Sequence, residues 1–265
     1  MDFGSFDIIT TPPVYFWSVA VVAVLAVAIS KSGFGGALGS LSVPVLLFVL
    51  PPKAVLGVLL PLFLVIDVWV VHTWRRMLDR RILLFMCGFG VLGQLVGWVL
   101  FDYLSDRVLT FLIGTIAIIT AANYARRRIW PAAQSHAEIA AVVSRRIWRR
   151  SALWCGLSGV TSFVSLAGGI PAQVFLLPHG LARQAFVGTM CVYFLTINLA
   201  KIPFYFDVGI FTVETFKVAV FLLPVIPLGV MIGRWLNNNM SDRIFYDISH
   251  FILLCMGARL IHISV

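Results

Sequence analysis

The chain is dominated by long apolar stretches that alternate with short polar ones. A helix needs about 20 mostly apolar residues to cross a hydrocarbon core roughly 30 Å thick, and this chain carries enough for roughly eight to ten such segments. Hydrophobic residues make up 60% of it and charged residues 12%, against about 45–50% and 25% in soluble domains. We therefore predict an all-α integral membrane protein. The apolar segments are expected at residues 14–31, 37–50, 54–72, 82–101, 108–125, 151–167, 170–178, 184–202, 214–234 and 244–263.

The net charge of +9 comes from arginines that gather in two places between apolar segments, residues 75–81 and residues 126–150. Basic loops of this kind are typical of the cytoplasmic side of membrane proteins. A nucleic-acid-binding protein would instead present an extended basic face. We expect no nucleic-acid partner.

Motifs for metal binding or catalysis do not occur in the sequence. The four cysteines form no CxxC, the five histidines form no HxxxH or HExxH, and there is no GxSxG or P-loop. These spacings are the ones that supply metal ligands, nucleophiles and phosphate-binding loops. We expect no metal, no cofactor and no enzymatic activity.

The polar stretch 126–150 divides the chain into a first repeat, 1–125, and a second repeat, 151–265. Its residues 136–150 fit two structures. One is a basic amphipathic helix on the membrane surface with Trp148 at headgroup level, and the other is a basic loop. Both halves together are expected to form one transport domain.

The two halves resemble each other at three anchors in the same order. The first anchor is an Ala-x-x-Gly, which ends at Gly57 and at Gly188. The second is a Gly-x-x-x-Gly followed by Ser-Asp-Arg, and the third is a Gly-Gly pair. The second anchor begins at Gly93 and Gly229, and the third lies at Gly35-Gly36 and Gly168-Gly169.

Charge predicts that the halves have opposite orientations. The loop at 73–81 is basic, whereas its counterpart at 203–214 carries Asp207 and Glu214 and no basic residue. By the positive-inside rule such matching loops lie on opposite sides of the membrane. About five segments per half, an odd number, require the same inversion. We predict an inverted repeat with 126–150 in the cytoplasm and both termini in the periplasm.

The second segment of each half is short and interrupted by glycine and proline. Residues 37–50 and 170–178 are too short to cross about 30 Å as helices. Paired broken segments at corresponding positions indicate a transporter's binding site near the bilayer midplane. The alternative is that the glycines only allow helices to pack closely.

The stretch Ser32-Gly-Phe-Gly-Gly-Ala-Leu-Gly-Ser-Leu-Ser-Val-Pro44, followed by Pro-Pro-Lys-Ala-Val-Leu-Gly57, resembles the Gly-rich opening of the TauE/SafE family of sulfite exporters. The resemblance covers residues 15–263. The second-half motif departs from it, with Leu166-Ala167 where the family more often has glycine. The resemblance implies a permease in the cell inner membrane that transports sulfite, sulfonates or other small sulfur-containing anions, with export as the expected direction.

A buried anion needs hydrogen-bond donors and positive potential, which helix N-termini, lysine, serine and amide side chains supply. Lys31 could instead extend to the interface, and the two glutamines could instead bond between helices. The predicted substrate-binding residues are Lys31, Ser32, Gly33, Gly35, Gly36, Gln94, Ser165, Gly168, Gly169 and Gln173.

Asp67 and Asn198 fall at the same offset after Gly57 and Gly188. A carboxylate inside a membrane helix is a candidate for proton or cation coupling, so both are predicted coupling residues. The alternative places Asp67 near the cytoplasmic face. Lys201 and Arg183, at the ends of segment 184–202, are expected at interfaces.

The predicted function is secondary transport by alternating access around a midplane site. The alternative is an anion channel, or a permease for small carboxylates, which could use the same helix ends. The expected partners are a small anion and the lipid bilayer. Proton coupling and homodimer formation are left open.

Overall fold

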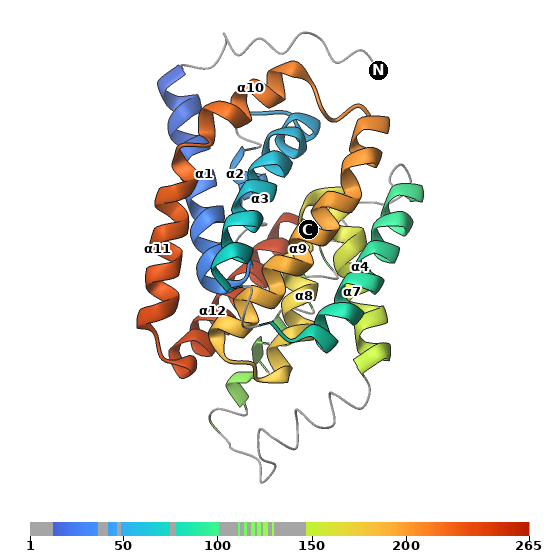
Figure 1. Cartoon of the computed structure of the whole chain (residues 1–265), viewed down its shortest axis with the longest axis vertical. Helices are drawn as coiled ribbons and strands as arrows, with labels where there is room; N and C mark the ends of the chain where they lie inside the picture. The colour runs from blue at the N-terminus through green and yellow to red at the C-terminus, as the bar shows by residue number, and fades with distance from the viewer. Residues whose placement is uncertain are drawn as a thin grey trace.

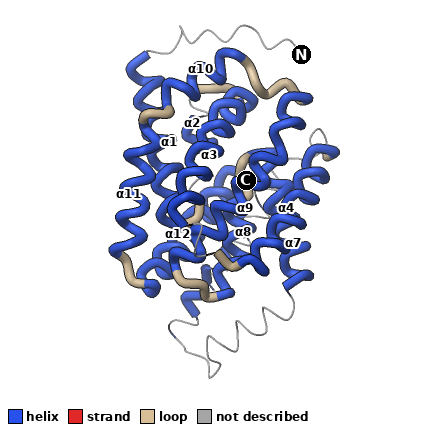
Figure 2. Tube along the Cα trace, in the orientation of Figure 1, coloured by secondary structure: helices blue, strands red, loops and turns tan. Residues whose placement is uncertain are grey.

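The computed structural model describes residues 13–36, 42–46, 49–74, 78–100 and 147–264, together with scattered helical positions between 111 and 129. Every regular element in these ranges is a helix, and no strand occurs among them (Figure 2). The all-α prediction is confirmed for this part of the chain. Apart from those scattered positions, segment 108–125 and most of the linker lie outside the described residues.

The helices follow the predicted apolar segments closely. The first half contains α1 (Pro13–Phe34), α2 (Ser42–Leu46), α3 (Pro52–Trp74) and α4 (Arg80–Val99). The second half contains α7 (Ile147–Ser165), α8 (Gly169–Leu176), the 3-10 helix η3 (Leu177–His179), α9 (Arg183–Asp207), α10 (Val213–Leu222), α11 (Val225–Asn239) and α12 (Asp242–Ser264).

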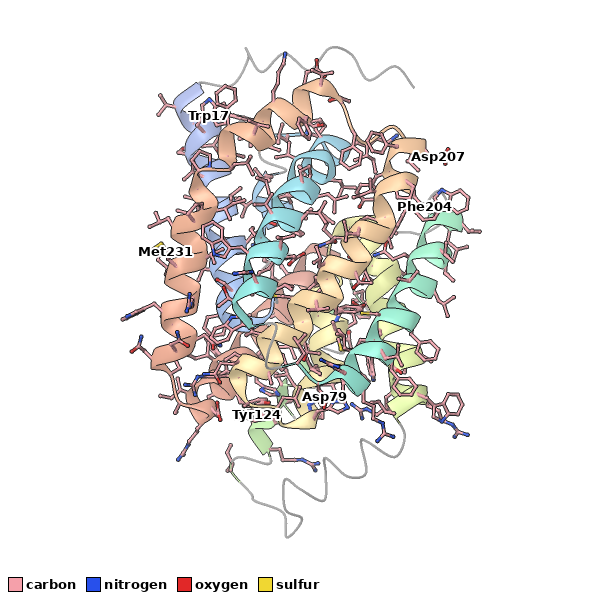
Figure 3. The ribbon with its side chains drawn as sticks, in the orientation of Figure 1. Trp17, Asp79, Tyr124, Phe204, Asp207 and Met231 are labelled. Carbon is pink, nitrogen blue, oxygen red and sulfur yellow. The ribbon has the colours of Figure 1, made fainter. Side chains whose placement is uncertain are left out.

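Several helices can cross a membrane. Among the described residues, α1, α3, α4 and α9 are long and apolar enough to do so, and α10 with α11, joined at a 52° bend, can form a fifth span. Large apolar side chains on the outer surface, such as Leu84, Phe221 and Met231, are exposed, and Figure 3 shows Met231 at the edge of the bundle. Such a surface suits lipid, and the chain is a multi-pass membrane protein.

Corresponding helices of the two halves run in opposite directions (Figure 1). Helices α1 and α3 run from the top of the view to the bottom, and α7 and α9 run from the bottom to the top. In the same way α4 runs upward and α11 runs downward. Asp79 caps the start of α4 by accepting from the Ile82 N–H at 3.0 Å, and Thr212 and Thr215 form a capping box at the start of α10.

The Gly-x-x-x-Gly motifs bring helices of different halves into close contact. A Cβ on Gly93 would lie 2.1 Å from the carbonyl oxygen of Gly156, so α4 and α7 touch through their backbones. A Cβ on Gly233 would lie 2.6 Å from the carbonyl oxygen of Ile29, so α11 and α1 do the same. Contacts this close require residues without a side chain. The first helix of each half, α1 or α7, therefore packs against a helix of the other half.

The Ala-x-x-Gly glycines also contact the opposite half. Gly57, in α3, faces the carbonyl oxygen of Ile210 in the α9–α10 connection, where a Cβ would come within 2.6 Å. Gly188, in α9, faces Trp74 and Leu78 on either side of the α3–α4 connection, with Cβ distances of 3.0 to 3.1 Å. Helices α3 and α9 pack against each other between these contacts.

Candidate functional site

A buried ion pair joins α1 to α3 inside the bundle. Lys31 Nζ lies 2.5 Å from Asp67 Oδ1, and the two residues are 2% and 0% exposed. The ammonium group also lies 4.5 Å from the ring centroid of Phe63 and 5.0 Å from that of Phe194. Lys31 thus points into the protein, and the alternative of an interfacial lysine does not describe it.

Asn198 extends this pair to the second half. Its Nδ2 donates to Asp67 Oδ2 at 2.8 Å, so both oxygens of the carboxylate have a donor. Asp67 lies roughly 22 Å along α3 at 1.5 Å per residue, and it is fully buried rather than at the cytoplasmic end. Three predicted residues from α1, α3 and α9 therefore meet at one point.

Lys201 corrects a sequence-based expectation. It was expected at an interface, but it is 0% exposed. Its Nζ donates to the carbonyl oxygen of Ser162 at 2.8 Å and to Ser162 Oγ at 2.9 Å. The reason is that α9 continues through Pro203 to Asp207, beyond the predicted end at residue 202. Lys201 is one turn after Asn198, on the same face of α9.

Arg183, the other residue expected at an interface, lies at the start of α9 and is part-exposed. It pairs with Asp242 at 3.1 Å. It also donates to the carbonyl oxygen of Asn237 at 2.6 Å, in the last turn of α11. Arg183 thus connects two helix ends and does not contact the buried lysines.

The glycine run after Ser32 ends a helix and does not begin one. Gly35 and Gly36 have φ angles of +67° and +92°, and the Gly36 N–H donates to the carbonyl oxygen of Ser30 at 3.0 Å. Left-handed residues of this kind terminate helices. The prediction that Gly33, Gly35 and Gly36 offer free N–H groups at a helix N-terminus is wrong, because this end of α1 presents carbonyl groups.

Helix α7 ends with the same geometry. Leu166 has a φ of +55°, and the Ala167 N–H donates to the carbonyl oxygen of Thr161 at 3.2 Å. Leu166 and Ala167 follow Gly35 and Gly36 by 131 positions, the separation that also relates Asp67 to Asn198. In the second half, the residues equivalent to Gly35-Gly36 are therefore Leu166-Ala167, two positions before the Gly-Gly pair. By the same offset Ser162 is equivalent to Lys31.

Gly168 and Gly169 do stand at a helix N-terminus, because Gly168 caps α8 and Gly169 is its first residue. Gly168 is closely enclosed by α7. A Cβ there would come within 2.6 Å of the Ser158 carbonyl oxygen, and its own carbonyl oxygen accepts from Ser158 Oγ at 2.7 Å.

Two amide side chains donate to carbonyl groups at the end of α1 that have no partner within the helix. Gln173 Nε2, from α8, donates to the carbonyl oxygen of Phe34 at 2.8 Å. Asn237 Nδ2, from α11, donates to the carbonyl oxygen of Gly33 at 2.9 Å. The Oε1 of Gln173 and the Oδ1 of Asn237 are buried without a partner in the described part of the chain. Asn237 is not among the predicted residues, although an asparagine four residues after Gly233 in an apolar helix could have indicated it.

The two predicted serines bond within their own helices. Ser32 Oγ donates to the carbonyl oxygen of Ala28 at 2.6 Å, and Ser165 Oγ donates to that of Thr161 at 3.1 Å. Gly33 packs against Gly233, with a Cβ position 3.0 Å from its carbonyl oxygen. Ser32 and Gly33 therefore lie in the packing contact between α1 and α11, as the alternative interpretation expected.

Gln94 is the most isolated polar side chain near this region. It is 0% exposed, and neither Nε2 nor Oε1 has a hydrogen-bond partner among the residues described. A buried amide without partners costs roughly 1–3 kcal/mol. Gln94 is therefore available for a further hydrogen bond.

The buried polar cluster of Lys31, Asp67, Asn198 and Lys201 carries charge that suits an anion. Two buried lysines face one buried aspartate, and the surrounding polar groups are neutral donors and acceptors. Among the residues described, no group of three His, Cys, Asp or Glu side chains could hold a metal ion. Its ammonium and amide groups have the chemistry that a small negative group would need.

Comparison with known proteins identifies a family. Residues 19–260 match the sequence model of the family described as sulfite exporter TauE/SafE. Neither a curated protein nor a solved structure matches the chain.

Proposed function

Because the chain belongs to the sulfite exporter TauE/SafE family of membrane transporters, we propose that it is a secondary transporter of small sulfur-containing anions. Sulfite and organosulfonates are the expected substrates, and export is the expected direction. The observation that carries the proposal is the buried polar cluster of Lys31, Asp67, Asn198 and Lys201. It is formed by helices of both halves.

The two halves are proposed to be inverted repeats. The opposite directions of α1 and α7, and of α3 and α9, support this (Figure 1). So do the reciprocal glycine contacts, in which Gly97 meets Val160 and Phe163 of α7 while Gly233 meets Ile29 and Ser32 of α1. Val160 and Phe163 follow Ile29 and Ser32 by the same 131 positions that separate Asp67 and Asn198. A duplicated unit accounts for this common offset.

The transport cycle is proposed to be alternating access about the α3–α9 contact. Asp67 and Asn198 meet where these helices cross, and a contact between equivalent helices lies near the axis of an inverted repeat. Asp67 holds Lys31 through one oxygen and Asn198 through the other. Protonation of Asp67 would remove the negative charge that holds Lys31, which makes it the proposed coupling residue.

The protein is proposed to lie in the cell inner membrane with residues 126–150 in the cytoplasm and both termini in the periplasm. Single cysteines at position 136 and at position 5, in a cysteine-free background, test this in whole cells. A membrane-impermeant thiol reagent should label position 5 only. Labelling of position 136 from outside would reverse the orientation.

Flux into proteoliposomes tests the function. The substrates are sulfite, thiosulfate, sulfoacetate and taurine, with simple carboxylates as controls. A saturable flux that depends on an imposed gradient supports a secondary transporter. Ohmic single-channel currents would support the channel alternative, and transport of carboxylates alone would replace the substrate class. If no sulfur anion is carried or competes, the proposed substrate is wrong.

A further inference from the structure

The two buried lysines differ in whether a negative side chain balances their charge. Lys31 has a carboxylate partner, Asp67, at 2.5 Å. Lys201 donates only to the carbonyl and hydroxyl oxygens of Ser162 in the described part of the chain. It also lies 5.7 Å from the ring centroid of Tyr205. An ammonium group has three donors, so Lys201 retains a third for another ligand.

A buried ammonium without a counter-charge costs several kcal/mol. A negative ligand beside it removes much of that cost, so the ligand and the charge on Lys201 stabilise each other. Ser162, which positions Lys201, occupies in α7 the place that Lys31 occupies in α1. Each half thus places one ammonium group beside this position, but a carboxylate accompanies it only in the first half.

Gln94 lies at the same level of the bundle as Lys201. A Cβ on Gly90 of α4 would lie 3.0 Å from Ile197 of α9, and the rings of Trp98 and Phe204 are 5.0 Å apart. Gln94 stands between Gly90 and Trp98, and Lys201 stands between Ile197 and Phe204. Both amide atoms of Gln94 are buried without a partner in the residues described. An amide that can donate to an oxyanion therefore accompanies the ammonium group.

We propose that Lys201, with Gln94, binds the transported anion, and that the site accepts one negative charge at a time. Among the residues described, the formal charges of the buried side chains sum to +1, from +1 at Lys31, −1 at Asp67 and +1 at Lys201. A monoanion such as an alkylsulfonate brings the total to zero, whereas a dianion leaves an uncompensated negative charge in low dielectric. This inference rests on the proposed function and specifies its substrate by charge.

The test compares methanesulfonate with methanedisulfonate, which carry the same functional group and differ in charge and in size by one sulfonate. In proteoliposomes the wild type should carry methanesulfonate at least about tenfold faster, since tenfold corresponds to roughly 1.4 kcal/mol. Lys201→Met should lose this flux. Lys217→Met, which removes an exposed lysine of α10, is the matched control and should retain it.

Two further variants test the sum of charges by binding to the detergent-purified protein, because variants of the proposed coupling residue Asp67 need not transport. Lys31→Met/Asp67→Asn removes both charges of the ion pair and leaves the total at +1, so methanesulfonate should still bind more tightly than methanedisulfonate. Asp67→Asn alone raises the total to +2, and the affinity for methanedisulfonate should gain relative to that for methanesulfonate by roughly tenfold. An unchanged ratio in Asp67→Asn, or full flux in Lys201→Met, would overturn the inference.

Binding to the detergent-purified protein separates this inference from the proposed function. Methanesulfonate should raise the melting temperature of the wild type and not that of Lys201→Met. If binding requires Lys201 but no variant shows flux, the inference holds and the transport proposal fails. If flux occurs without dependence on Lys201, transport stands and the inference fails. If neither binding nor flux depends on Lys201, the inference also fails.

Discussion

The ends of α1 and α7 have the same backbone course and different side chains. Both end in a left-handed residue, Gly35 with φ +67° and Leu166 with φ +55°. One turn earlier, α1 carries Lys31 and α7 carries Ser162. The lysine of the second half is instead Lys201, on α9, and it reaches back to Ser162. The comparison teaches that each half keeps one ammonium group at this place, although only the first half supplies an acid.

Removal of that acid should have the largest effect. Asp67→Ala leaves Lys31 buried without its partner, which costs about 3–5 kcal/mol. Its counterpart Asn198→Ala removes one hydrogen bond and leaves a charge pair intact, which costs about 1–3 kcal/mol. Thermal unfolding in detergent should rank the two variants in this order. Asp207→Ala, at the exposed end of α9 (Figure 3), should unfold like the wild type, and equal losses in both halves would contradict the comparison.

The glycine contacts should respond alike in both halves. Gly93→Ala places a Cβ 2.1 Å from the carbonyl oxygen of Gly156, and Gly233→Ala places one 2.6 Å from that of Ile29. Overpacking of this kind costs about 1–3 kcal/mol. Both variants should therefore lower the melting temperature.

Gly88→Ala is the matched control for these contacts, because nothing lies within 4 Å of its Cβ position. Alanine at this helical position should raise the free energy of unfolding by roughly 0.5–1 kcal/mol. If Gly93→Ala behaved like Gly88→Ala, the close approach of α4 and α7 would be wrong.

The smallest expected difference lies between the left-handed glycines that follow α1 and α9. Gly36→Ala puts a Cβ on a residue with φ +92°, 3.3 Å from Phe194, and strain in this region costs about 1–2 kcal/mol. Gly209→Ala has a similar φ of +69° but open space around it. We expect comparable small losses of stability in both variants and reduced flux only in Gly36→Ala, because Gly36 also borders Lys31. Equal flux in the two would separate the end of α1 from the transport site.

The parts of the fold that follow from local chemistry could be predicted from the sequence. Apolar length gave the membrane helices, because bilayer thickness fixes how long they must be. The shared offset of Asp67 and Asn198 after a glycine anticipated two equivalent positions, and these residues bond to each other. The Gly-x-x-x-Gly repeats, which served as anchors of the duplication, lie where α4 contacts α7 and where α11 contacts α1.

The site itself depended on contacts that the sequence does not display. Lys201 and Ser162 are 39 residues apart, so no local pattern indicates that the ammonium group is buried. The Gly-Gly run was interpreted as the start of a helix, because glycine is compatible with either end and only the φ angles of Gly35 and Gly36 decide between them. The same ambiguity misplaced the correspondence of the halves by two residues.

The glycine crossings have a consequence for how the protein is made. The glycine face of α4 can pack against α7 only after residue 156 has been synthesised. Helix α1 can pack against α11 only after residue 233 has been synthesised. Neither half can complete its packing alone, so the ribosome must finish most of the chain before the earliest helix reaches its final neighbours. The glycines of α11 are therefore among the last residues that α1 requires before its packing is complete.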